Sequence, residues 1–222
     1  LQNHPLGTDN QVDWHYGFLE WLGANHRAGR VLREGLSRFK DSEVLHRRFR
    51  ERLLKRRNPD RLEQAYADLV EQQGESASLL AYAGLGSVRA AEHYRRKRRY
   101  EDAKAAYERA ITYFDRAVKS DASFEDFTDR AAALAYAARA RVAYLLKDDE
   151  SATREIIASF SRGPQAAGTR DGMGITPGET AQMLIARLRK DEKTDLARQL
   201  EIALSKIDPE LLVPDIGLMP GR

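Results

Sequence analysis

Apolar residues recur at steps of three and four residues along almost the whole chain, a spacing typical of helices that bury one face. No stretch of strict alternation between apolar and polar residues is long enough to predict a strand. The segment 100–118 shows the helical stripe most clearly, at Tyr100, Ala103, Tyr107, Ala110, Ile111, Phe114, Ala117 and Val118. The sequence therefore predicts an all-α protein.

Helix start and stop signals divide this pattern into ten segments. Asn58 precedes Pro59 where the fourth helix is expected to begin, and Gly74 follows its end, an order typical of helix boundaries. Thr176 and Glu179 occupy the two positions of a capping box. The predicted helices cover residues 12–23, 26–39, 42–56, 60–73, 77–97, 100–119, 124–146, 149–161, 177–190 and 192–206.

A short motif of small and large apolar residues recurs among these helices. Its copies lie 34, 41 and 49 residues apart and begin at Ala28, Leu62, Ala103 and Ala152. Small residues let paired helices approach closely, and tyrosines can fill the space between one pair and the next. The fullest copy extends over both helices of a pair and reads Ala91-x-x-Tyr94-x5-Tyr100-x-x-Ala103-x-x-x-Tyr107-x-x-Ala110.

This copy resembles the tetratricopeptide repeat (TPR). The resemblance implies a right-handed array of about four TPR-like helix pairs over residues 12–161, followed by C-terminal capping helices. Two features depart from the family: the later copies are more widely spaced, and the proline that commonly closes a repeat is absent. Residues 1–11 are then an N-terminal extension. Residues 177–222 form the helical cap and an extended tail whose apolar side chains are expected to lie back on the last helices.

Residues 162–176 interrupt the helical pattern with four glycines, which predicts a flexible loop or a hinge. The run from Gly168 to Gly174 could in principle cradle an anion with its backbone amides. It lacks the lysine of a phosphate-binding loop. A flexible linker is therefore the preferred interpretation.

Three aromatic residues, Trp14, Phe18 and Trp21, lie at helical spacing in the first predicted helix. The simpler interpretation is that they form the core of the first helix pair. The alternative is an exposed aromatic slot for a partner.

Residues with the spacing of a catalytic or metal site are not found in the sequence. The chain has no cysteine, which removes disulfides, thiolate metal sites and cysteine nucleophiles. Glu43 and His46 share a helix face, but carboxylate-bridged metal sites need several such helices. Gly84-Leu85-Gly86 falls inside a helix and lacks the third glycine of a dinucleotide fingerprint, so close helix packing is the favoured interpretation. We expect no enzymatic activity, no metal site and no cofactor.

The TPR resemblance also implies that the first helix of each pair lines a concave groove. The aligned positions are arginines, glutamates and apolar residues, without the asparagine of the lysine–asparagine clamp that grips peptide C-termini in some relatives. This surface suits an extended peptide with acidic side chains, although ordinary solvated positions would look the same. The predicted groove residues are Arg47, Glu51, Leu85, Val88, Glu92, Arg95, Arg141 and Tyr144.

Basic residues gather at the expected turns within the helix pairs, and there they predict a basic rim along one edge. Such a rim could contact an acidic protein, anionic lipid headgroups or a nucleic acid backbone. The same residues could instead cap helix ends and pair with neighbouring glutamates. The rim residues are Arg27, Arg30, Lys55, Arg56, Arg57, Arg96, Lys97, Arg98 and Arg99.

Two functional hypotheses follow. The first is a scaffold or adaptor that binds a protein or peptide partner of acidic character in the groove. The alternative is a binder of polyanions, nucleic acid or an acidic surface, through the rim. Nucleic acid is the weaker version because the net charge is only +3 and no nucleic-acid-reading module is recognisable. No apolar run approaches the roughly 18 residues of a membrane span, and the sequence assigns no compartment.

Overall fold

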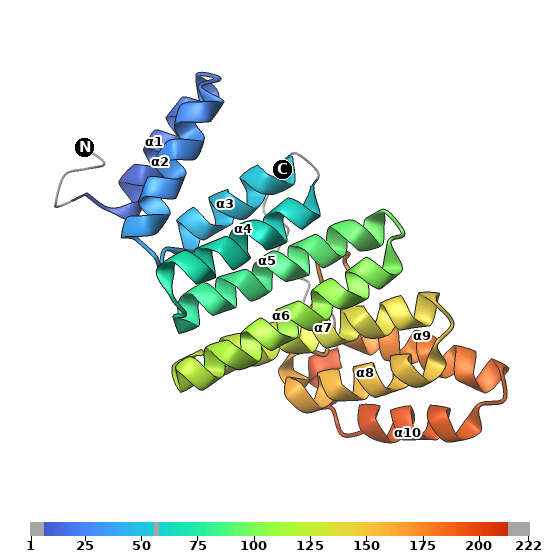
Figure 1. Ribbon diagram of the computed structural model, residues 1–222. Coiled ribbons are helices and arrows are strands. Elements are labelled where there is room, and N and C mark those ends of the chain that lie inside the picture. The colour runs from blue at the N-terminus through green and yellow to red at the C-terminus, as the bar shows by residue number, and fades with distance from the viewer. Residues whose placement is uncertain (1–6, 56–57, 213–222) are drawn as a thin grey trace.

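The computed structural model describes residues 7–55 and 58–212. Within these ranges the chain is all-α, without a strand, as predicted (Figure 1). The ten predicted helices are all present, and their observed ends lie within about three residues of the expected ones. The α-helices are α1 (Asp9–Trp21), α2 (Asn25–Arg38), α3 (Glu43–Lys55), α4 (Pro59–Gln73), α5 (Ala77–Arg96), α6 (Tyr100–Ser120), α7 (Glu125–Leu145), α8 (Asp149–Arg162), α9 (Pro177–Lys190) and α10 (Thr194–Leu204). Three short 3₁₀ helices are η1 (Ala122–Phe124), η2 (Pro164–Ala166) and η3 (Pro209–Leu212).

The largest difference in helix bounds is at the start of α1, which begins three residues before the predicted position. Thr8 caps it: its hydroxyl accepts a hydrogen bond from the Gln11 amide at 3.3 Å. The Gln11 side chain accepts one from the Thr8 amide at 3.2 Å. This capping box uses glutamine at the third position, so the helix starts before its first apolar residue.

Successive helices lie side by side and step across the molecule from α1 to α10 (Figure 1). One buried cluster runs through α1 to α7, and a second joins α7 to α10 with η3. Leu211 and Leu212 of η3 pack against the second cluster, as expected for the start of the tail. The apolar residues from Val213 onward lie outside the described residues. No helix in the described part of the chain is long and apolar enough to cross a membrane.

Four turns between neighbouring helices share one backbone geometry. In each, a residue with positive φ is followed by one whose N–H bonds the carbonyl five residues earlier, which is a Schellman-type end. The positive-φ residues are Gly23 (72°), Arg98 (59°), Lys147 (62°) and Glu192 (58°). A buried alanine follows each of them after five residues: Ala28, Ala103, Ala152 and Ala197. The copy at Ala197 was not recognised in the sequence. These four turns follow one edge of the molecule (Figure 1).

Glycines in α5 allow close packing of neighbouring helices. A Cβ on Gly84 would lie 2.5 Å from the Phe114 ring, and one on Gly86 would lie 2.7 Å from the Tyr66 ring. No ring can approach that closely to a real Cβ. The Gly84-Leu85-Gly86 sequence is therefore a packing site, in agreement with the favoured interpretation.

The aromatic residues of α1 are exposed, so the prediction that they form the core of the first pair is wrong. Trp14 is 75% exposed, Phe18 55% and Trp21 80%. The buried residues of α1 are Val12, Tyr16 and Leu19. The helix therefore has two apolar stripes. The described neighbours α2 and α3 cover the stripe of Val12, Tyr16 and Leu19, and the stripe of aromatic residues stays exposed.

Candidate functional site

A groove with two adjoining cavities lies along α3, α5 and α7. The larger cavity, of about 640 Å³, lies between α3 and α5, and the smaller, of about 290 Å³, lies between α5, α7 and the loop before α9. The two share Arg89 and Glu92. We call them the basic cavity and the apolar cavity.

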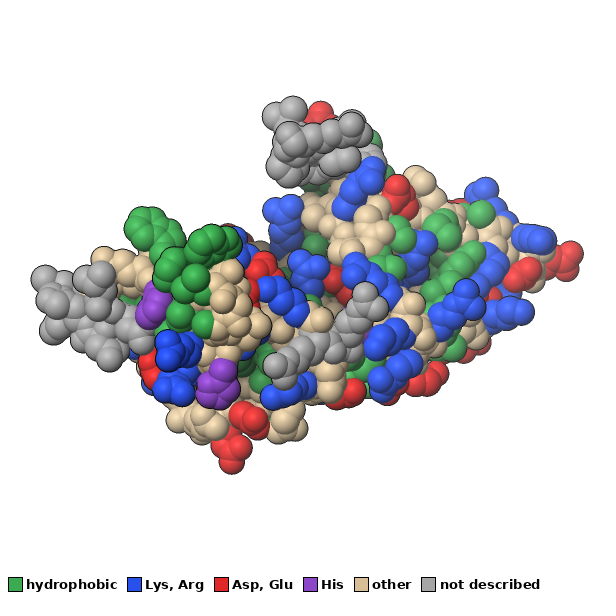
Figure 2. Space-filling model, turned by 90° about the horizontal axis from the view of Figure 1, so that it is seen from above, with side chains coloured by type: hydrophobic (Ala, Val, Ile, Leu, Met, Phe, Trp, Pro, Cys, Tyr) green, Lys and Arg blue, Asp and Glu red, His purple; other side chains and the backbone are tan. Residues whose placement is uncertain are grey.

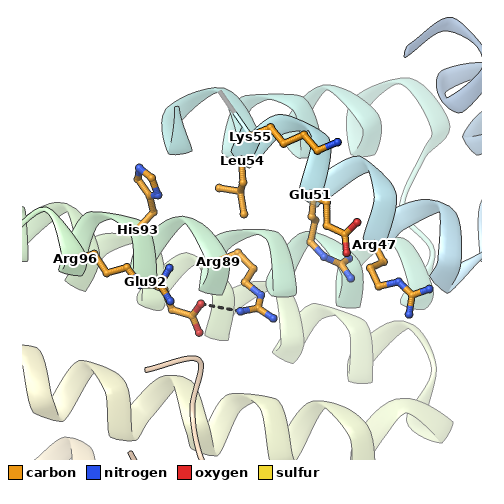
Figure 3. A pocket seen from close by; sticks show the side chains of 9 residues that line it. Arg47, Glu51, Leu54, Lys55, Arg89, Glu92, His93 and Arg96 are labelled. Carbon is orange, nitrogen blue, oxygen red and sulfur yellow. Dashed lines mark hydrogen bonds and ion pairs between the residues drawn. The ribbon is translucent and has the colours of Figure 1, made fainter. Parts of the chain in front are cut away.

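Two helix faces supply the basic cavity (Figure 3). On α3 the lining residues follow steps of three, one, three and one, and on α5 they follow steps of three, one and three, so each set forms one helical stripe. The α3 residues are Arg47, Arg50, Glu51, Leu54 and Lys55, and the α5 residues are Arg89, Glu92, His93 and Arg96.

The charges of the basic cavity are only partly compensated. Arg89 pairs with Glu92 at 3.0 Å, and Glu51 pairs with Arg48 outside the cavity at 3.6 Å. Lys55 pairs with Glu20 at 2.5 Å. The other three basic side chains form no ion pair with a described carboxylate; they are Arg47, Arg50 and Arg96. Guanidinium groups without a carboxylate are strong donors to an incoming carboxylate or phosphate.

The apolar cavity continues the groove toward α7. Its walls are mostly apolar: Leu85, Val88, Tyr107, Ala131, Leu134 and Ala138. A further hollow of about 460 Å³ shares Leu85 and is lined by Tyr82, Phe124 and Phe127 among others. The groove therefore offers a cationic part beside an apolar part, and Leu85 and Val88, two of the predicted groove residues, line the apolar part.

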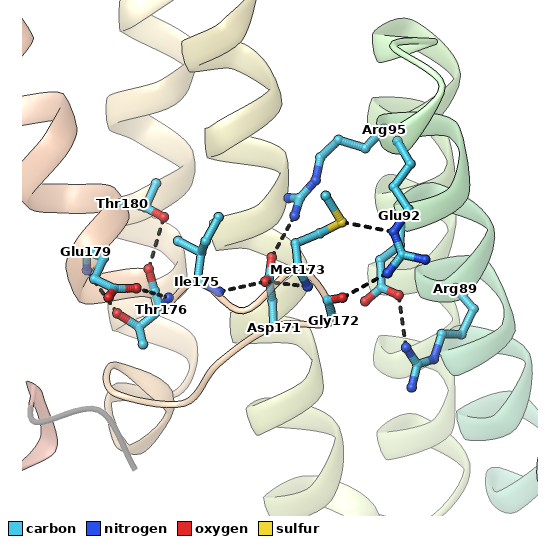
Figure 4. Close-up of polar contacts among 11 residues, drawn as sticks. Arg89, Glu92, Arg95, Asp171, Gly172, Met173, Ile175, Thr176, Glu179 and Thr180 are labelled. Carbon is cyan, nitrogen blue, oxygen red and sulfur yellow. Dashed lines mark hydrogen bonds and ion pairs between the residues drawn. The ribbon is translucent and has the colours of Figure 1, made fainter. Parts of the chain in front are cut away.

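The loop between α8 and α9 closes one end of the groove (Figure 4). Asp171 accepts hydrogen bonds from the amides of Met173 at 2.8 Å and Ile175 at 3.0 Å, and one from Arg95 at 3.0 Å. Arg96 donates to the Gly172 carbonyl at 3.1 Å. These contacts pack the loop, which was expected to be a flexible linker, on α5. They also occupy amides of the segment that was considered as an anion cradle.

Arg95 and Glu92 were predicted to face a partner, and both are buried. The Arg95 guanidinium lies under the loop in its ion pair with Asp171. Glu92 packs so tightly that a Cβ on Gly172 would collide with its carboxylate. The loop packs against both side chains.

Arg141 and Tyr144, on the far side of the predicted groove, do not line either cavity. Arg141 is partly buried. Its pKa is lowered, mainly by this burial and to a lesser extent by the nearby charge of Arg95. The Arg187 guanidinium of α9 lies 3.8 Å from the centre of the Tyr144 ring, and it donates to the Tyr144 carbonyl at 2.6 Å. Helix α9 therefore packs against α7 and covers the surface at Tyr144.

Several groove residues were not predicted from the sequence: Arg50, Leu54, Arg89 and His93. A signal for them was present in the spacing. Arg50 and Leu54 follow Arg47 by steps of three and four, Arg89 lies three residues before Glu92, and His93 lies three residues before Arg96.

The predicted basic rim is interrupted by ion pairs. Arg99 pairs with Asp102 at 2.6 Å, and Lys55 with Glu20. Arg96 turns onto the loop. The remaining described rim residues, Arg27, Arg30, Lys97 and Arg98, are exposed. Arg56 and Arg57 lie outside the described residues.

His46, weighed as a metal ligand with Glu43, has a structural environment. Its Nε2 lies 2.8 Å from the Lys40 carbonyl, and its Nδ1 lies 3.3 Å from the Tyr66 hydroxyl. Burial lowers the pKa of His46 to about 4. Both ring nitrogens are thus engaged by protein groups.

Comparison of the chain with protein-family models, with curated proteins and with solved structures found no match. The groove and its charges therefore carry the functional argument.

Proposed function

We propose that the chain is a TPR-like helical-repeat protein that binds an extended, acidic segment of a partner protein in the groove. A repeat arrangement is supported by the four turns of one geometry, each followed after five residues by a buried alanine. In this proposal the array is right-handed, and α9 with α10 forms a further pair of the same kind.

The observation that carries the proposal is the set of three arginines, Arg47, Arg50 and Arg96, without a described carboxylate partner in a groove that continues into an apolar cavity. An extended peptide can place carboxylates against the guanidinium groups and apolar side chains in the second cavity. The chain is proposed to bind and not to catalyse.

The loop itself illustrates the recognition. In Figure 4 the Asp171 carboxylate meets a guanidinium of α5, and the next carbonyl, of Gly172, accepts from Arg96. A carboxylate on a neighbouring backbone segment can therefore meet the arginines of this helix.

The test uses a fluorescein-labelled peptide of about ten residues that alternates glutamate and leucine, with a lysine-for-glutamate peptide as the reference. Fluorescence anisotropy should show binding of the acidic peptide alone. The double variant Arg47→Ala/Arg50→Ala should weaken it at least about tenfold, because charge-assisted hydrogen bonds are lost. The matched control Arg27→Ala/Arg30→Ala removes the same charge from the rim and should bind as the wild type does. Equal losses in both variants would contradict groove binding.

A second candidate is polyanion binding through the rim. It is favoured by Arg27, Arg30 and Arg98, which are exposed and form no ion pair with a described residue. In the same experiment this candidate predicts the opposite ranking of the two double variants, with a nucleic acid oligomer as the ligand.

A further inference from the structure

Four large apolar side chains form a stripe on the outer side of α1. They follow helical steps of four, three and one residues and leave no charged residue between them on that face. Figure 2 shows the hydrophobic patch they make at one end of the molecule. The rings of Phe18 and Trp21 stack with centroids 6.0 Å apart. This aromatic stripe consists of Trp14, Phe18, Trp21 and Leu22.

The shared turn geometry identifies the same positions on other helices. Trp14, Phe18 and Trp21 lie nine, five and two residues before the positive-φ residue Gly23. On α7 the corresponding first two residues are Ala138 and Val142, which are buried in one cluster with side chains of α5 and α6.

The corresponding positions on α9 and α3 face the preceding helices too. On α9 the middle residue is Arg187, which bonds the Tyr144 carbonyl of α7 and the Asp149 carboxylate of α8. On α3 the residues 34 positions after Trp14 and Phe18 are Arg48 and Arg52. They pair with Asp13 at 2.7 Å and with Glu20 at 2.9 Å, both on α1.

On α5 the corresponding residues, Arg89, His93 and Arg96, line the basic cavity opposite α3. On each of these helices at least one of the corresponding residues faces the preceding helices, whereas Leu145, Met183 and Lys190 at the remaining positions are exposed. The stripe of α1 is therefore the face on which another helix packs, and among the described residues nothing covers it.

The size of the stripe is adequate for an interface. At about 150–250 Å² for each aromatic side chain, it leaves on the order of 500 Å² of apolar surface open. Two such surfaces brought together would bury about 1,000 Å², the area of a weak but specific interface. Of the three acidic residues of α1, Asp13 and Glu20 are already paired with α3, and Asp9 accepts a hydrogen bond from Ser42.

The best complement to the stripe in the described chain is a second copy of the stripe. The outer face of α10 at the opposite end carries exposed charged residues, including Asp195 and Arg198, with Ile202 as its exposed large apolar side chain. A head-to-tail contact would bury those charges against tryptophan. A two-fold contact between two α1 helices pairs apolar with apolar surface. We infer that the aromatic stripe of α1 is the interface of a head-to-head homodimer.

The chain contains two tryptophans, and both lie on the stripe, so intrinsic fluorescence reports directly on its burial. Sedimentation equilibrium over the micromolar range should show the mass rising from one copy toward two. Tryptophan emission should shift to shorter wavelength over the same concentrations. Phe18→Glu leaves both tryptophans in place but introduces a charge. It should remain monomeric, keep solvent-exposed emission and retain the far-ultraviolet circular dichroism of the wild type, since Phe18 is outside the core.

The control is Ile202→Glu on α10, which should dimerise like the wild type. A wild-type protein that stays monomeric with exposed tryptophan emission at all concentrations overturns the inference. Loss of dimers in Ile202→Glu overturns it in favour of head-to-tail contact. A blue shift that requires vesicles of phosphatidylcholine and phosphatidylglycerol, in protein that remains monomeric, overturns it in favour of a lipid surface.

Discussion

Arg95 on α5 and Asp171 in the loop before α9 form an ion pair at 3.0 Å, with side chains only 3% and 11% exposed. The two residues are 76 positions apart in the chain. Asp171 also accepts the amides of Met173 and Ile175, so one carboxylate both shapes the loop and fastens it to α5. The end of the groove is therefore built by a contact between distant segments.

Removal of this carboxylate should destabilise the protein strongly. Asp171→Ala leaves the Arg95 charge buried without its partner, and its Nη1 already lacks a hydrogen-bond partner among the described residues. The expected loss is about 3–5 kcal/mol in the free energy of unfolding, measured by urea denaturation. Asp102→Ala breaks the exposed pair with Arg99 and should cost less than about 1 kcal/mol. Similar costs for the two variants would show that the Asp171 contact does not hold the loop.

The buried His46 should make stability depend on pH. Its pKa of about 4 in the folded protein lies below the ordinary value of 6.5, so between these values the unfolded chain binds more protons. The free energy of unfolding should therefore fall as the pH is lowered from 6.5 toward 4, by on the order of 2–3 kcal/mol.

The variant His46→Gln isolates this contribution, because the carboxyl groups titrate in both proteins and the imidazole only in the wild type. Glutamine can still donate to the Lys40 carbonyl but does not take up a proton in this range. Urea midpoints at pH 7 and pH 5 should differ more for the wild type than for the variant. An identical pH dependence would mean that His46 is solvated in the folded state.

The glycine at position 84 should be required for the packing of α5 on α6. Gly84→Ala places a Cβ 2.5 Å from the Phe114 ring, and overpacking of this kind costs about 1–3 kcal/mol. Gly17→Ala on α1 has open space around the new Cβ and should stabilise by about 0.5–1 kcal/mol through helix propensity. Thermal denaturation of the two variants should give shifts of opposite sign. A gain in both would mean that the ring moves aside at no cost.

Salt should distinguish the two proposed binding surfaces. Binding of the acidic peptide in the groove should weaken moderately with added salt, because apolar contacts contribute as well. Binding of single-stranded nucleic acid along the rim should follow a log–log slope of about −0.7 for each phosphate neutralised. Anisotropy titrations at several salt concentrations measure both slopes. A steep slope for the peptide would indicate that charged side chains alone bind it, and not the mixed cationic and apolar groove.

Much of the helical framework could be predicted from local sequence alone. Caps such as Thr176 with Glu179 and the three- and four-residue apolar steps act over a single turn, so the ten helices were found with small errors. The basic character of α3 and α5 followed from the same stripes. The cationic side of the groove could therefore be anticipated, although Arg50 and Arg89 were overlooked.

Burial depended on contacts that helical periodicity does not encode. The two apolar stripes of α1 are equivalent in their spacing, and the neighbouring α2 and α3 cover Val12, Tyr16 and Leu19 but not the tryptophans. The loop before α9 covers Arg95, and α9 packs on Tyr144. Helix formation is decided by residues within about four positions of one another, so local sequence determines it. The accessibility of a side chain is decided by segments many tens of residues away, and those meet only in the folded chain.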